Sequence, residues 1–125
     1  MNLKQSRLVT EDVERLTGFY EMLTGAKARV LNAGYVEFQR DPCAGLAIAA
    51  SAVTQFYGEG TLTAADNRSL VLDFEVEDVD AEYARLKDKI AAWVQAPKTM
   101  PWGNKSILFR DPDGNLINMF TPVPA

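Results

Sequence analysis

The stretch from Arg68 to Val76 alternates polar and apolar side chains, and its polar half carries two carboxylates. Successive side chains of a strand point to opposite faces, so Asp73 and Glu75 share one face with Val71. A carboxylate on a sheet face can orient a ligand or remove a proton, which makes Asp73 and Glu75 the candidate catalytic residues. On another expected strand, Arg7 could hold a ligand carboxylate in a bidentate pair. The structural alternative is an ordinary ion pair between Arg7 and Asp73.

Two other residue types limit the chemistry. The chain contains no histidine, which removes histidine-based triads and the commonest transition-metal ligand. Its one cysteine, Cys43, lies in an expected turn with no neighbouring base or helix start to activate the thiol. We therefore expect no nucleophilic cysteine and no disulfide within the chain.

Composition excludes several classes of partner. The 125 residues are 47% hydrophobic and 24% charged, as expected for one globular domain. The net charge of −4 and the scattered basic residues argue against nucleic acid or an anionic membrane as partner. No apolar run reaches the roughly 18 residues of a membrane span. The first six residues contain no apolar signal segment, and the lone cysteine favours a reducing compartment, so we expect a cytoplasmic protein.

Two short motifs recur in the same order along the chain. The acidic motif at Glu11 returns 66 residues later at Glu77, and Arg40-Asp41-Pro42 returns 70 residues later at Arg110. Ordered matches at nearly equal offsets predict two copies of one unit. Each copy has the pattern of a strand, a helix and three strands. We predict an α+β domain over 1–125, with module one at about 1–50, a connector at 51–67 and module two at about 68–125.

Four stretches make the chain similar to the vicinal oxygen chelate superfamily, which includes glyoxalase I, bleomycin-resistance proteins and extradiol dioxygenases. They are Thr10–Tyr20, Val76–Arg85, Pro101–Gly103 and Arg110–Phe120. The resemblance covers essentially the whole chain. It implies tandem βαβββ modules whose curved mixed sheets enclose a ligand cavity, and it implies a homodimer.

The resemblance also implies four positions for metal ligands, two on the first strands of the modules and two on the last. They correspond to Gln5, Ile48, Val71 and Asn118 in this sequence. Ile48 and Val71 have no donor atoms, and the neutral amides of Gln5 and Asn118 are weak ligands for a divalent ion. We therefore expect no metal and no other cofactor, and we expect these four side chains to line a metal-free cavity.

Two aromatic residues are further candidates for ligand contact. Phe120 shares a strand face with Asn118, and Trp102 lies in an expected loop at the cavity rim, where an aromatic ring could stack on a planar ligand. The alternative for Trp102 is that it packs its loop onto the core. The candidate ligand-binding residues are Gln5, Arg7, Ile48, Val71, Trp102, Asn118 and Phe120.

These observations favour a metal-free protein that binds a small molecule, similar to the bleomycin-resistance branch. The alternative is a lyase, isomerase or dioxygenase-type enzyme with an unconventional metal site or a carboxylate base. A third possibility is a member whose role is protein–protein interaction. The fold does not decide between them, since one scaffold carries many chemistries.

Overall fold

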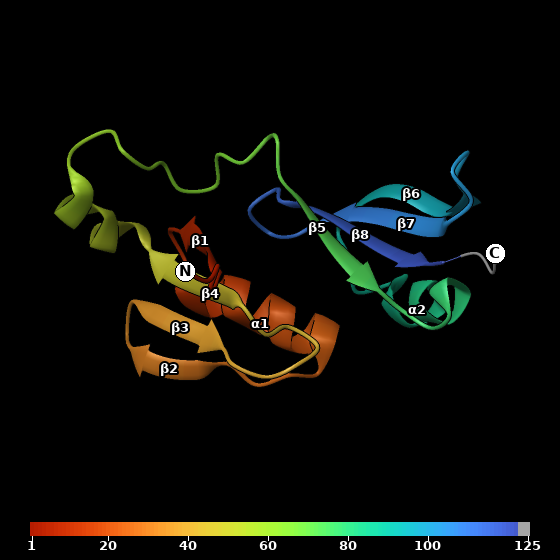
Figure 1. Cartoon of the computed structure of the whole chain (residues 1–125), viewed down its shortest axis with the longest axis horizontal. Coiled ribbons are helices and arrows are strands. Elements are labelled where there is room, and N and C mark those ends of the chain that lie inside the picture. Colours follow the sequence, from red (N-terminus) through yellow and green to blue (C-terminus); the bar gives the residue numbers. More distant parts are fainter. Residues whose placement is uncertain (123–125) are drawn as a thin grey trace. The chain divides into compact units, whose positions relative to one another are not determined.

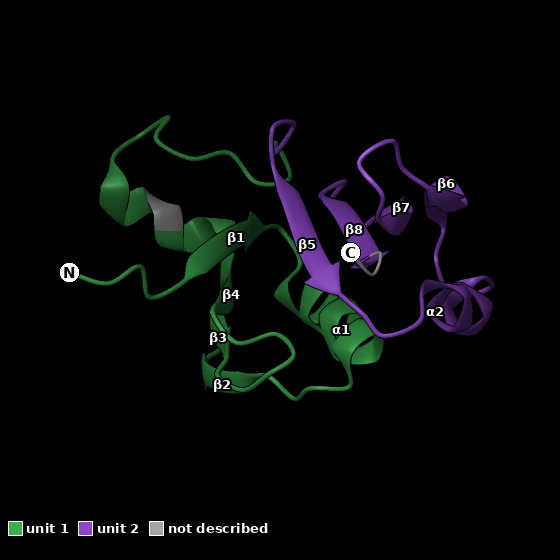
Figure 2. Ribbon diagram, turned by 45° about the vertical axis from the view of Figure 1, so that its right-hand side comes forward, with its two compact units in different colours: residues 1–66 green, residues 67–125 purple. Residues whose placement is uncertain are grey.

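The computed structural model describes residues 1–122, apart from the side chain of Thr54. The chain divides into two compact units, Met1–Asp66 and Asn67–Ala125 (Figures 1 and 2). Each unit consists of a strand, a helix and three further strands, so the expected α+β fold with two βαβββ modules is confirmed. No helix among the described residues is long and apolar enough to cross a membrane.

Unit 1 contains a four-stranded mixed sheet in the order β1-β4-β3-β2, in which only β1 and β4 are parallel. A short 3-10 helix, η1, follows β4 where the sequence predicted an irregular connector. The elements are β1 (Ser6–Thr10), α1 (Val13–Thr24), β2 (Arg29–Asn32), β3 (Tyr35–Phe38), β4 (Leu46–Ala50) and η1 (Ser51–Tyr57).

Unit 2 repeats this topology in a sheet of order β5-β8-β7-β6, with β5 and β8 parallel. Its last three strands form an antiparallel meander, and β6 is longer than its counterpart β2. The elements are β5 (Val71–Glu75), α2 (Val79–Leu86), β6 (Ala92–Thr99), β7 (Lys105–Arg110) and β8 (Leu116–Thr121).

The two helices begin in the same way. The carboxylates of Asp12 and Asp78 each accept a hydrogen bond of 3.1 Å from a backbone N–H three residues on. Such an N-cap satisfies one of the donors that a helix start leaves free. The helices end differently, since α1 stops at Gly25 in the left-handed region (φ 73°) and α2 ends at Lys87 without a glycine.

In each unit the helix packs on one face of the sheet. In unit 1, Leu16 and Tyr20 of α1 are buried together with Val36 and Ile48 of the sheet. In unit 2, Leu86 of α2 is buried above the apolar side of β7 and β8. The opposite face of each sheet has no helix of its own unit over it, and the candidate residues must be sought on those two faces.

The Asp-Pro-Asp-Gly-Asn turn before β8 is held by its first residue. Asp111 is only 4% exposed, and its carboxylate accepts hydrogen bonds from the backbone N–H groups of Asp113 and Asn115, both at 2.9 Å. It also accepts one from the Asn115 side chain at 2.7 Å. These bonds account for the burial of Asp111 and fix where β8 begins.

Candidate functional site

The face of the unit 1 sheet opposite α1 is built from three adjacent strands. Paired residues of neighbouring strands point to the same side, so two cross-strand rows form this surface. One row is Arg7, Ala47 and Glu37, and the other is Val9, Ala49 and Tyr35. We call this surface the unit 1 face. Its two alanines are at most 1% exposed and form a low floor between taller polar side chains.

A chain of hydrogen bonds runs across the unit 1 face. The side-chain amide of Gln5 donates to the Tyr35 hydroxyl at 2.7 Å, and that hydroxyl donates to the Glu37 carboxylate at 2.5 Å. The Gln39 amide donates to the other Glu37 oxygen at 3.3 Å. Burial, and then the hydrogen bond to Glu37, raises the pKa of Tyr35 above 10.0. The hydrogen bonds from Tyr35 and Gln39 lower the pKa of Glu37 below 4.5. Tyr35 therefore stays a protonated donor and Glu37 a charged acceptor near neutral pH.

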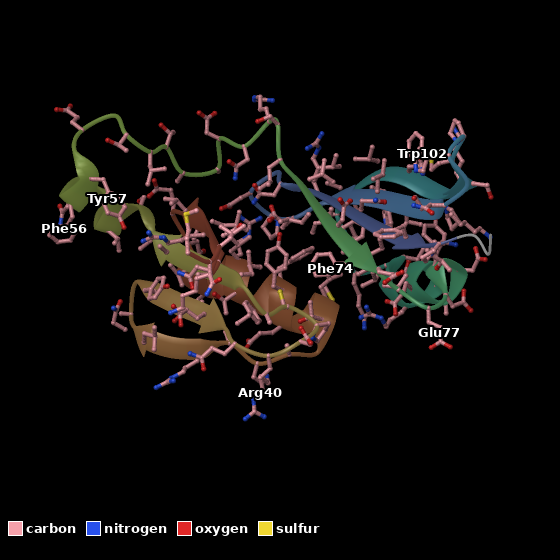
Figure 3. All side chains as sticks on the ribbon, viewed as in Figure 1. Arg40, Phe56, Tyr57, Phe74, Glu77 and Trp102 are labelled. Atoms are coloured by element: carbon pink, nitrogen blue, oxygen red, sulfur yellow. The ribbon has the colours of Figure 1, made fainter. Side chains whose placement is uncertain are left out.

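Arg7 lies between two aromatic rings of unit 1. Its guanidinium carbon is 5.4 Å from the centroid of the Tyr57 ring and 6.0 Å from that of Tyr35. Tyr57 extends from η1 towards β1, whereas its neighbour Phe56 points away and is 78% exposed (Figure 3). The sequence gave weight to neither Tyr35 nor Glu37, although the alternation of Tyr35-Val36-Glu37-Phe38 would have placed both on one strand face.

The structure overturns the placement of Ile48. This residue pairs with Leu8 and Val36, is fully buried on the helix side of the sheet, and so does not share a face with Arg7. The error comes from the loop before β4. Residues 39–45 separate the paired Phe38 and Leu46, whereas only 111–115 separate Arg110 and Leu116. The repeated Arg-Asp-Pro motif is therefore not at equivalent positions. A shift of one residue turns a side chain to the other face, and Ala47 takes the place expected for Ile48.

The corresponding face of unit 2 brings five of the candidate residues together. Val71, Asp73 and Glu75 of β5 pair with Leu116, Asn118 and Phe120 of β8, and all six side chains point away from the helix side. On β7, Leu108 pairs with Asn118 and extends the same surface. We call this surface the unit 2 face. The candidates that it gathers are Val71, Asp73, Glu75, Asn118 and Phe120.

The polar centre of the unit 2 face is one pair of side chains. The Asn118 amide nitrogen donates to the Asp73 carboxylate at 3.0 Å. This bond fixes the orientation of the amide, because a carboxylate can only accept. The Asn118 Oδ1 is buried and has no hydrogen-bond partner among the described residues. Around it lie apolar side chains, of which Val71 is 46% exposed.

A small pocket lies at the end of β5, next to the unit 2 face. It has a volume of about 430 Å³ and is lined by Glu75, Val76, Glu77, Thr121 and Pro122. The Thr121 hydroxyl is already engaged, since it donates to the Val76 carbonyl at 3.0 Å and accepts from the Val79 N–H at 3.2 Å. Of the candidate residues, only Glu75 reaches this pocket.

The two tryptophans have different surroundings. Trp102 is 70% exposed on the loop between β6 and β7, well away from the packed side of the sheet (Figure 3). Trp93 instead packs edge-on against Tyr83 and Phe109, with ring centroids 5.0 and 5.2 Å away. The alternative that Trp102 packs its loop onto the core is therefore wrong, and whether its ring meets a ligand stays a prediction.

The donor set does not fit a divalent metal. Within residues 1–122, no three side chains of the histidine, cysteine, aspartate or glutamate type lie close enough together to hold an ion. At the four family positions the chain offers the amides of Gln5 and Asn118, the isopropyl group of Val71, and the methyl group of Ala47 in place of Ile48. Two neutral amides do not replace the hydration that a divalent ion loses on binding.

The chain is similar to proteins of one large family. The model of the Glyoxalase/Bleomycin resistance protein/Dioxygenase superfamily matches residues 2–119. A search of curated proteins found no significant match. Among solved structures, a protein of unknown function from Agrobacterium tumefaciens str. C58 is 23% identical, with 98% of this chain and 95% of that chain covered and a TM-score of 0.81.

Two other solved structures carry family names. A glyoxalase/bleomycin resistance protein/dioxygenase family enzyme from Burkholderia phytofirmans PsJN is 15% identical, with 98% of this chain and 100% of that chain covered and a TM-score of 0.84. The bleomycin resistance determinant encoded on the transposon Tn5 is 21% identical, with 98% of each chain covered and a TM-score of 0.68. At such identities a structural likeness shows the fold alone. The family match extends over nearly the whole sequence, and the chain therefore belongs to the Glyoxalase/Bleomycin resistance protein/Dioxygenase superfamily.

Proposed function

We propose that this protein binds a small organic molecule on the unit 2 face and does so without a metal. Members of the superfamily bind small molecules. The observation that carries the proposal is Asn118, whose buried Oδ1 lacks a donor while its amide nitrogen is held by Asp73. A buried acceptor without a partner is costly, and a ligand N–H or O–H would satisfy it.

The surroundings of Asn118 suit a mostly apolar ligand. Val71, Leu116 and Phe120 supply apolar surface on both paired strands, and Leu108 extends it on β7. Small-molecule sites commonly combine such walls with a few polar groups that fix orientation. A planar aromatic molecule with one N–H donor matches this description.

The test uses a neutral probe of that kind, N-phenyl-1-naphthylamine, whose fluorescence rises in apolar surroundings. We expect Val71→Glu to weaken probe binding by about tenfold or more, because a charge is placed on apolar contact surface. Val30→Glu is the matched control, since Val30 is an exposed valine (68%) of the edge strand β2 in unit 1. Equal binding by both variants would contradict the proposal.

The alternative function is catalysis by Asp73 or Glu75 acting as a base. A binding protein returns its ligand unchanged, so mass spectrometry of probe and screened ligands after long incubation separates the two functions. Turnover that is lost in Asp73→Asn or Glu75→Gln, in a protein that still folds, would establish the enzyme. Recovery of intact ligand with saturable thermal stabilisation supports binding alone.

We also propose that the protein acts as a homodimer in the cytoplasm. The resemblance to family members of this length supports the dimer, and the single cysteine supports a reducing compartment. Sedimentation equilibrium should give twice the chain mass of 13.8 kDa. A mass of one chain at micromolar concentration would contradict the dimer.

A further inference from the structure

We propose that Arg7 anchors a second binding site, on the unit 1 face, which takes the carboxylate of a small organic molecule. The site uses residues of unit 1 alone and does not depend on binding at the unit 2 face. It rests on the position of the guanidinium group, the charge around it and the low floor beside it.

The two tyrosine rings hold the Arg7 side chain in place. The distances of 5.4 Å to the Tyr57 ring and 6.0 Å to the Tyr35 ring are within the range of cation–π contact. Ring contacts occupy the faces of a guanidinium group and leave its N–H edge available. Within the described part of unit 1, no carboxylate forms an ion pair with Arg7. The planar N–H edge matches a planar carboxylate in a bidentate pair.

The charges of the unit 1 face favour an anion. Glu37 is the acidic residue of the row, and its oxygens already accept hydrogen bonds from Tyr35 and Gln39. Lys4 and Arg29 lie near enough to Glu37 to lower its pKa. Together with Arg7 these side chains give the surface more positive than negative charge, although the whole chain has a net charge of −4.

The floor leaves room for the body of the ligand. Ala47 lies between Arg7 and Glu37 in the cross-strand row, and Ala49 lies beside Tyr35. Neighbouring strands are about 4.8 Å apart, so Arg7 and Glu37 stand roughly 10 Å apart across this row. A flat molecule can therefore lie on the two alanines, with its carboxylate at Arg7 and its body against the Tyr35 ring.

The experiment titrates isotope-labelled protein with benzoate and, separately, with benzamide, its neutral analogue of the same shape, while backbone amide resonances are followed. We expect benzoate to shift resonances at residues 5–7, 35–37, 47 and 57. Benzamide should bind about tenfold more weakly, because it lacks the charge that strengthens the hydrogen bonds. Inorganic phosphate, a tetrahedral anion, tests whether any oxyanion suffices.

Three variants identify the anchor. Arg7→Gln should weaken benzoate binding by about tenfold or more, and Arg7→Lys should weaken it less, because lysine keeps the charge but loses the planar fork. Arg40→Gln is the matched control. Arg40 is an exposed arginine of the loop before β4 and points away from the sheet (Figure 3), so its replacement should leave binding unchanged.

Other outcomes overturn the proposal. Equal binding of benzoate and benzamide would show that charge plays no part, and equal loss in Arg7→Gln and Arg40→Gln would show a general charge effect. Phosphate binding as tightly as benzoate would exclude a carboxylate site. Benzoate binding that emerges only in Asp73→Asn would show that Asp73 already occupies Arg7. Loss of N-phenyl-1-naphthylamine binding without loss of benzoate binding would contradict only the function proposed for the unit 2 face.

Discussion

At the level of single residues, the hydroxyl of Tyr35 sits between a donor that lowers its pKa and an acceptor that raises it. Burial contributes most to the raised pKa, followed by the hydrogen bond to Glu37, while the hydrogen bond from Gln5 acts in the opposite direction. The side chains on either side of the hydroxyl therefore have opposite effects on its ionisation.

Replacing the two partners should shift the pKa of Tyr35 in opposite directions. Glu37→Gln removes both the negative charge and the charged acceptor, so the pKa should fall towards 10.0. Gln5→Leu removes a donor that favours the phenolate, so the pKa should rise. Tyrosine ring carbon resonances, assigned with Tyr35→Phe, report each titration. Shifts of the same sign in both variants would contradict this hydrogen-bond chain.

Glu37 should also contribute to the loss of stability in acid. Its pKa is lowered below 4.5 in the folded protein, so its contribution to stability is present above that pH and is lost as the pH falls through the folded value. The free energy of unfolding, measured by denaturant titration, should therefore fall less steeply on acidification in Glu37→Gln than in the parent. Identical slopes would show that the carboxylate has the same pKa folded and unfolded.

Cys43 should be inert in the folded protein. It is 4% exposed, and burial raises the pKa of its thiol to about 11. Because the thiolate is the reactive form, an aromatic disulfide reagent should react very slowly at neutral pH in the native state. In denaturant the same protein should release one thiol per chain. Rapid modification without denaturant would show that the thiol is accessible and activated.

At the level of elements, the glycines of α1 have opposite roles. Gly25 adopts φ 73° at the end of the helix, whereas Gly18 lies within the helix and a Cβ there would meet nothing within 4 Å. Gly25→Ala should destabilise the protein by about 1 kcal/mol, because a side chain disfavours the left-handed region. Gly18→Ala should stabilise it by roughly 0.5–1 kcal/mol through helix propensity. Thermal unfolding of the pair measures both, and a Gly25→Ala variant as stable as the parent would contradict the cap assignment.

Local signals explain which elements the sequence could predict. The N-caps at Asp12 and Asp78 and the stop at Gly25 depend on neighbouring residues only, and all three are confirmed. The alternation over Val71–Glu75 likewise placed Asp73, Glu75 and Val71 on one face. Ile48 was misplaced because the register of β4 depends on the length of the preceding loop. The 3-10 helix η1, which carries Tyr57 to Arg7, has no comparable local signal.

At the level of the whole molecule, the repeat predicted the fold better than the site. The two copies share their topology, so the motifs that recur were enough to define the modules. The open faces have diverged, since unit 1 carries a tyrosine–glutamate network over alanines and unit 2 an amide–carboxylate pair among apolar residues. Cross-strand partners build each surface, and those partners are set by register rather than by sequence order.

The same comparison predicts how the whole chain responds to metal ions. Of the four positions that hold a metal in metal-dependent relatives, Ala47 and Val71 offer no donor, and Gln5 and Asn118 offer neutral amides, with the Asn118 nitrogen already bound to Asp73. We expect far less than one ion per chain after incubation with nickel, zinc, manganese or iron(II), as measured by elemental analysis. Cys43→Ser serves as a control for thiol binding. One tightly held ion per chain in both proteins would show a metal site built from other residues and would favour the enzyme over the binding protein.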